Sequence, residues 1–162
     1  MEQRVDFLLR DSALHTRAHC SRVLLLALVI GNHYRAQNDE LDVLAACAVF
    51  HDTRRQDDLL DVGHGQRAAN YYQAFCSTGK LTFDPRVFAI ISWHDKPDPE
   101  GITAITRDQG KRCAQLYCVF KDADGLDRIR LGKAELDPAQ LRTDYAPELV
   151  PFAEQLLKLS KF

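Results

Sequence analysis

Residues 41–52 (LDVLAACAVFHD) form an apolar run that ends abruptly in His51 and Asp52. Leu44, Cys47 and His51 recur at intervals of three and four, which predicts an α-helix. A helix this apolar is buried on more than one side, so its last turn carries an imidazole and a carboxylate into or beside the core. A buried carboxylate is costly unless it is paired or bound to a metal ion. Taken alone, such a pair is more often a capping histidine beside a surface aspartate, so the rest of the chain must decide.

Helical periodicity extends over most of the 162 residues. Asp84 followed by Pro85 is the clearest helix start, because a carboxylate caps free N–H groups and proline fits the first helical position. Residues 81–83 are the one candidate for a β-strand, and residues 95–110 look like a long irregular loop. Apolar stripes predict helices at about 5–9, 12–31, 39–52, 64–75, 84–94, 113–124 and 147–159. We therefore predict an all-α, single-domain helical bundle over residues 1–162, with about six to seven helices.

The composition fits a soluble globular domain. Hydrophobic residues make up 46%, and a net charge of −2 gives no strong case for binding DNA, RNA or an anionic membrane. The five cysteines are odd in number and form no CxxC pair, which fits reduced thiols in the cytosol. The most hydrophobic segment, residues 23–30, is too short to span a bilayer, and the N-terminus lacks the layout of a signal peptide. We expect a cytoplasmic protein with no membrane partner.

Ligand-type residues stand on the apolar faces of three predicted helices. They are His19, the pair His51 and Asp52, and Asp124. One shared divalent ion would satisfy all four, and helical bundles commonly build metal sites from side chains on facing helices. Mixed imidazole and carboxylate ligands suit Mn, Fe, Co, Ni or Zn more than Ca, and Mg is kept among the choices. Two histidines and two aspartates leave coordination positions open to water and substrate, which is typical of a catalytic site. We expect one ion, with two as the alternative.

The order H…HD…D resembles the signature of the HD-domain metal-dependent phosphohydrolases. Residues 19–23 (HCSRV) resemble the family's His-x-x-Arg-Val segment, and residues 50–52 (FHD) resemble its central doublet. Residues 122–127 (DADGLD) look like its Ala-Asp-Arg-Leu segment. The resemblance covers about residues 15–130, which would form the metal-site core of the domain. It implies four metal ligands: His19, His51, Asp52 and Asp124.

The last ligand has a runner-up, Asp122. Asp124 is favoured because it precedes an x-Leu pair, as the family's aspartate does, and because it continues the apolar stripe that begins at Cys113. The chain departs from the family at Gly125, where many members have an arginine or lysine. A substrate contact from that position is therefore not expected here.

Residues 51–72 also look like a subgroup of small, poorly characterised HD hydrolases, in which a polar loop leads to a His-Gly pair and an Ala-rich helix. Binuclear members of the family carry further histidines between the doublet and the last aspartate, and His64 and His94 stand in that interval. We expect both to line the cleft and to hold substrate phosphate or water, with ligation of a second ion as the alternative. His15, one turn before His19, is interpreted as a residue that supports the ligands or starts the helix.

The resemblance implies a hydrolase of phosphate esters. Asp52 would be both a metal ligand and the catalytic residue that orients or deprotonates a metal-activated water. The substrate would be a small-molecule phosphomonoester or phosphodiester, and a nucleotide on family analogy alone. Guanidinium groups suit phosphate oxygens, and three arginines near the ligands in sequence are candidates: Arg55, Arg67 and Arg128.

Two other functions fit the same residues. The first is a catalytically silent HD domain that acts as a nucleotide-binding or protein-binding sensor. The second is an HD-type oxygenase with a di-iron centre, which would need His64 and His94 as additional ligands.

Overall fold

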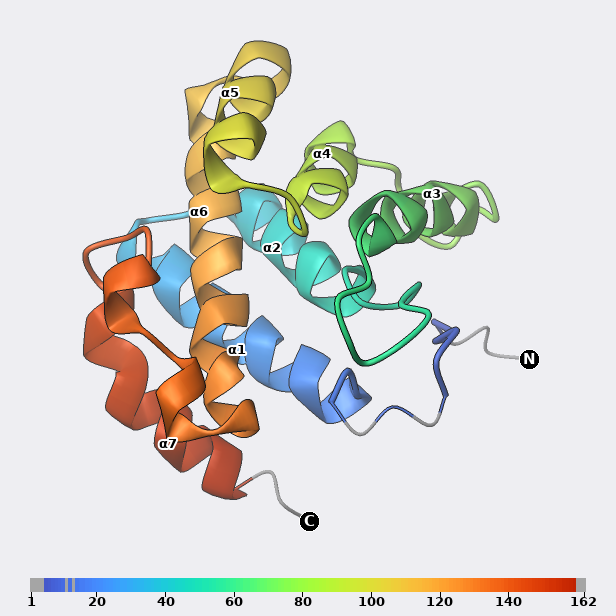
Figure 1. Ribbon diagram of the computed structural model, residues 1–162. Coiled ribbons are helices and arrows are strands. Elements are labelled where there is room, and N and C mark those ends of the chain that lie inside the picture. Colours follow the sequence, from blue (N-terminus) through green and yellow to red (C-terminus); the bar gives the residue numbers. More distant parts are fainter. Residues whose placement is uncertain (1–4, 11, 13, 160–162) are drawn as a thin grey trace.

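The computed structural model describes residues 5–10, 12 and 14–159, and these form an all-α, single-domain bundle (Figure 1). No strand occurs among them, and short 3₁₀ turns connect the last two helices. The helices are α1 (Arg17–His33), α2 (Asn38–Phe50), α3 (His64–Cys76), α4 (Pro85–Trp93), α5 (Asp98–Gln109), α6 (Lys111–Leu126) and α7 (Val150–Leu159). The prediction of six to seven helices is therefore confirmed.

Helix α6 runs through the middle of the bundle (Figure 1). It packs against α1 and α5, while α1 also packs against α2, and α3 pairs with α4. The core is continuous across these helices and includes the fully buried Leu26, Leu44, Ile90 and Phe120. Because α1, α2 and α6 meet within one core, ligand-type residues on their buried faces are brought toward the same place.

Two predicted helix starts have different outcomes. The Asp84 carboxylate accepts a hydrogen bond from the Arg86 N–H and Pro85 opens α4, as the sequence predicts. Helix α1, by contrast, begins at Arg17 with Thr16 as its cap, later in the chain than the predicted start at about residue 12. The Ser12 hydroxyl instead accepts the N–H groups of the residues two and three positions further along, which forms a separate turn before α1.

Two predictions of local structure are wrong. Residues 5–9 form no helix, because their backbone runs alongside the end of α2, where the Leu8 N–H donates to the Thr53 carbonyl at 2.9 Å. Residues 95–110 are not an irregular loop, because α5 occupies most of them. The prolines that end α4 also open α5, since proline is tolerated in the first turn of a helix.

Gly101 explains how closely α5 lies on α6. A Cβ atom at this position would stand 2.7 Å from the Tyr117 hydroxyl oxygen, so only glycine allows this approach. Ala104 and Ile105 on the same helix are buried by the contact. No helix among the described residues has the length and apolar character needed to cross a membrane.

Candidate metal centre

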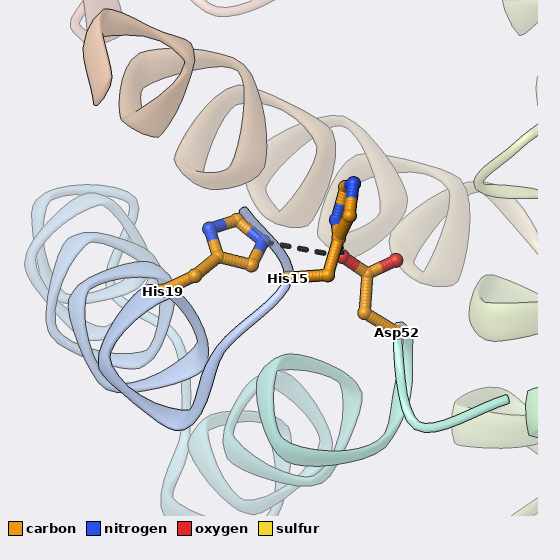
Figure 2. Close-up of side chains that lie close together, drawn as sticks. All are labelled: His15, His19 and Asp52. Carbon is orange, nitrogen blue, oxygen red and sulfur yellow. Dashed lines mark hydrogen bonds and ion pairs between the residues drawn. The ribbon is translucent and has the colours of Figure 1, made fainter. Parts of the chain in front are cut away.

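Asp52 lies at the centre of the ligand-type residues, just after the end of α2. Its Oδ2 atom is 2.6 Å from Nδ1 of His15, 3.4 Å from Nε2 of His19 and 3.5 Å from Nε2 of His51. Figure 2 shows His19 on α1 and Asp52 at the end of α2 facing one another, with His15 beside them. The carboxylate is buried, so each of these contacts acts with little screening by water.

The first group of ligands joins α1, α2 and α6. Nε2 of His19 lies 3.2 Å from Nε2 of His51. Oδ1 of Asp124 lies 3.4 Å from the first of these nitrogens and 3.8 Å from the second. Three ligand atoms from three helices thus converge within 4.8 Å of one another, a spacing that could hold a metal ion.

The second group stands on the other side of the Asp52 carboxylate. Oδ1 of Asp52 is 3.3 Å from Nε2 of His64, at the start of α3, and 3.9 Å from Nε2 of His94, just after α4. The two imidazole nitrogens are 3.0 Å apart. Asp52 therefore directs one oxygen to each group.

The four histidines of the two groups have a common hydrogen-bonding pattern that fixes their tautomers. In three of them Nδ1 donates to a backbone carbonyl three residues earlier, which can only accept. The pairs are His51 to Ala48 at 3.0 Å, His64 to Asp61 at 2.6 Å and His94 to Ile91 at 2.7 Å. In His19, Nδ1 donates to a carboxylate. A neutral imidazole that donates from Nδ1 presents a lone pair at Nε2.

The close approach of the paired Nε2 atoms is the strongest sign that these residues could hold metal. At 3.0 and 3.2 Å the paired Nε2 atoms repel one another unless a cation or a proton lies between them. Imidazoles that ligate a metal typically donate their other N–H to a carbonyl or carboxylate in this way. The donor set could therefore hold metal.

Asp127 supports the first group and was not predicted from the sequence. Its Oδ2 accepts from Nδ1 of His19 at 2.7 Å, and its Oδ1 accepts from Nε of Arg22 at 2.6 Å. The side chain is buried. A sequence signal exists, because Asp127 follows Asp124 by three residues and Arg22 follows His19 by three, so each pair shares one side of its helix.

Asp95 supports the second group and was likewise missed. Its Oδ2 accepts the N–H groups of Gly63 at 2.7 Å and of Gly65 at 3.2 Å, which fixes the first turn of α3 and with it His64. The clue in the sequence was a second His-Asp pair, since Asp95 directly follows His94.

The carboxylates determine the charge of the centre. Burial lowers the pKa of His19, but the Asp124, Asp127 and Asp52 carboxylates outweigh it and raise the pKa to about 10. Burial would raise the pKa of Asp52, yet the surrounding imidazoles hold it well below its usual value. His51 lies deeper and burial lowers its pKa to about 4. The centre thus stabilises positive charge on His19 next to a neutral His51 imidazole.

The centre opens into a cavity of about 330 Å³. Its lining includes four cationic side chains as well as His15, His64, His94, Asp52 and Asp124. These cations are Arg55, Lys121, Arg128 and Arg130. Arg55 approaches two of the ligand residues, because its NH1 atom lies 3.3 Å from Nε2 of His64 and 3.8 Å from Oδ1 of Asp52.

Two residues that the sequence suggested for the site lie outside it. Arg67 is not among the described residues that line the cavity, and its NH2 group is paired with Asp61 at 2.5 Å. Asp122, the runner-up for the last ligand, accepts the backbone N–H groups of Arg142 and Thr143 at 2.8 and 2.7 Å. Asp124, and not Asp122, therefore meets His19 and His51.

Comparison with known proteins adds no relative. No protein-family model matches the chain, and neither a curated protein nor a solved structure does. The fold and the site alone define an all-α protein with a buried His/Asp cluster that could hold metal, which is compatible with an HD-type centre.

Proposed function

We propose that the protein is a metal-dependent hydrolase of phosphomonoesters or phosphodiesters that uses two divalent ions. The observation that carries this proposal is the position of Asp52 between two pairs of imidazoles whose Nε2 atoms face each other, beside a cavity whose lining includes four cationic side chains. His64 and His94 are then ligands of the second ion, which we now favour over the contact with substrate phosphate expected from the sequence.

The residues divide into two sets of ligands. His19, His51 and Asp124 would hold one ion, His64 and His94 the other, and Asp52 both. Mixed nitrogen and oxygen ligands suit Mn, Fe, Co, Ni or Zn. When bound, such ions polarise a phosphoryl oxygen and supply a nucleophilic water near neutral pH.

Cationic side chains would bind the substrate. Arg55, Lys121 and Arg128 line the cavity, and guanidinium and ammonium groups neutralise phosphate oxygens. Lys121 is held by the His94 carbonyl, to which Nζ donates at 2.6 Å, so it is fixed beside the second group. The Arg128 side chain is half exposed, which places it at the rim.

His15 is the residue best placed to move a proton. Its Nδ1 faces Oδ2 of Asp52 at 2.6 Å, its ring lines the cavity, and its other nitrogen points away from Asp52 (Figure 2). A carboxylate that fixes one imidazole nitrogen leaves the other to exchange a proton with the substrate. We infer that His15 protonates the leaving oxygen.

A di-iron oxygenase is the second candidate. That function requires His64 and His94 as ligands, and both stand within the cluster around Asp52. The same six residues therefore serve either chemistry, and the metal and the reaction must be determined by experiment.

The test is a metal-supplemented activity screen with the purified protein. Inorganic phosphate or nitrophenolate release would be measured from p-nitrophenyl phosphate, bis-p-nitrophenyl phosphate and nucleotides, with Mn, Co, Ni, Zn or Mg. We expect turnover that Asp52→Ala abolishes while the helical circular dichroism is kept. Asp42→Ala, which removes an exposed aspartate of α2, is the matched control.

Two results would redirect the proposal. A fully metal-loaded protein that hydrolyses no ester in the panel would favour the sensor function. A visible absorption band that requires iron and oxygen would favour the oxygenase.

A further inference from the structure

Three aliphatic side chains project from the mouth of the cavity with little cover. Leu59, Leu60 and Val62 are 81%, 89% and 72% exposed, and they lie between α2 and α3. Single exposed leucines are common on protein surfaces, but a contiguous apolar patch at the rim of a polar site indicates a binding surface. Leu14 and Leu131 line the same cavity from other segments of the chain.

The segment that carries these side chains is held in place by hydrogen bonds. Nε and NH2 of Arg55 donate to the carbonyls of Asp57 and Leu59 at 3.2 and 2.6 Å. The Asp61 carboxylate accepts the Gln56 N–H at 2.7 Å. These hydrogen bonds fix the backbone of the segment, while its aliphatic side chains stay exposed to solvent.

The lining combines two kinds of side chain. It includes the ligands and the cationic side chains, and its apolar members are all aliphatic. No Phe, Tyr or Trp occurs among the described residues that line the cavity. Nucleobases are usually held by stacking on aromatic rings, so this lining matches an aliphatic group better than a base.

We propose that the cavity takes phosphate esters whose organic group is aliphatic. The phosphate would lie against the ligand cluster and Arg55, and the hydrocarbon would lie against Leu59, Leu60 and Val62. The inference rests on the proposed function for the reaction and for the anionic head, but the preference for an aliphatic body rests on the lining of the cavity itself.

Binding of alkylphosphonates tests this preference without turnover. Methyl-, propyl- and hexylphosphonate would be titrated calorimetrically into the Mn-loaded protein. Because each methylene group that leaves water adds affinity, we expect hexylphosphonate to bind at least about tenfold more tightly than methylphosphonate.

Variants test whether the exposed leucines cause the tighter binding of hexylphosphonate. The double change Leu59→Ser with Leu60→Ser should reduce the advantage of the hexyl compound to about threefold or less, and leave the affinity for methylphosphonate unchanged. Leu159→Ser is the matched control, because that leucine is 67% exposed on α7 and does not line the cavity. Circular dichroism would verify that each variant is folded.

Three results would overturn the inference: equal affinity across the series, an unchanged hexyl advantage in the double variant, or tighter binding of adenosine monophosphate than of hexyl phosphate. A separate outcome concerns the reaction. If the alkylphosphonates bind as expected but hexyl phosphate releases no inorganic phosphate, the aliphatic site stands and the proposed hydrolase function fails.

Discussion

Gly65→Ala should separate the two histidines of the second group. A Cβ atom at this position would lie 2.6 Å from the Ile91 carbonyl oxygen and from Oδ1 of Asp95, and 2.9 Å from Nδ1 of His94. Ordinary contact begins at 3.4 Å, so α3 and the end of α4 must part by about 0.8 Å. Metal–ligand distances tolerate only about 0.2 Å. We therefore expect the second ion to bind about 100-fold more weakly, while the first is retained.

The same change has a predictable effect on stability. Overpacking of this kind costs about 1–3 kcal/mol, and replacing glycine in a helix regains up to about 1 kcal/mol. A net loss of about 1–2 kcal/mol in the free energy of unfolding would leave the protein folded. Urea unfolding of the metal-free protein measures this loss, and isothermal titration with Mn measures the two affinities.

Gly125→Ala is the control, because its Cβ would meet only the ends of two side chains, Leu141 at 3.3 Å and Arg142 at 3.9 Å. It should bind both ions as the wild type does. If Gly65→Ala also kept both ions at wild-type affinity, the close approach of α3 and α4 would not position His64, and the reasoning would be wrong.

Two further predictions concern buried carboxylates. Asp127→Asn should lower the affinity for the first metal ion about 10- to 100-fold in a chelator competition, because the Nδ1 donor of His19 loses its charged acceptor. An unchanged affinity would show that Asp127 does not support His19 as a ligand. Glu40→Gln should lower the free energy of unfolding by about 1–2 kcal/mol at pH 7. This loss is smaller than the pKa shift of Glu40 alone would give, because Arg112 is partly exposed and solvent screens the ion pair. The Arg112 guanidinium holds the pKa of Glu40 at about 2, against 4.5 for an ordinary glutamate, so this stability is present above pH 4.5 and is lost as the pH falls toward 2. Chemical unfolding of both proteins across this range should show the difference shrinking in acid, and a difference that does not depend on pH would contradict the assignment.

Most helices could be predicted from the sequence because their apolar stripes are long and regular. The exception is α5, where prolines indicated a break although they also open a helix. The prediction of a helix over residues 5–9 was wrong for the opposite reason. Their few apolar residues satisfy a helical spacing, but the segment gains its stabilisation from contact with the end of α2, through Leu8 and Thr53, which no local pattern reveals.

The candidate site was partly visible in the sequence. Ligand-type residues on apolar helix faces must meet in a bundle core, and His19, His51, Asp52 and Asp124 do so. What the sequence could not show was the direction of each ring. The bridging position of Asp52 depends on which oxygen faces which imidazole, and that follows from packing.

The partners that orient the rings were also hidden. Asp95 and Asp127 act through hydrogen bonds to groups distant in sequence, so their roles appear only in three dimensions. Arg67 was a plausible phosphate ligand by its nearness in sequence, yet it pairs with Asp61 and does not line the cavity.

The number of metal ions bound per chain tests the central claim most directly. Elemental analysis of the Mn-saturated, desalted protein should give about two ions for the wild type and about one for His64→Ala, because the second site loses a ligand while the first keeps all four. About one ion in both proteins would contradict the claim that Asp52 bridges two metal ions.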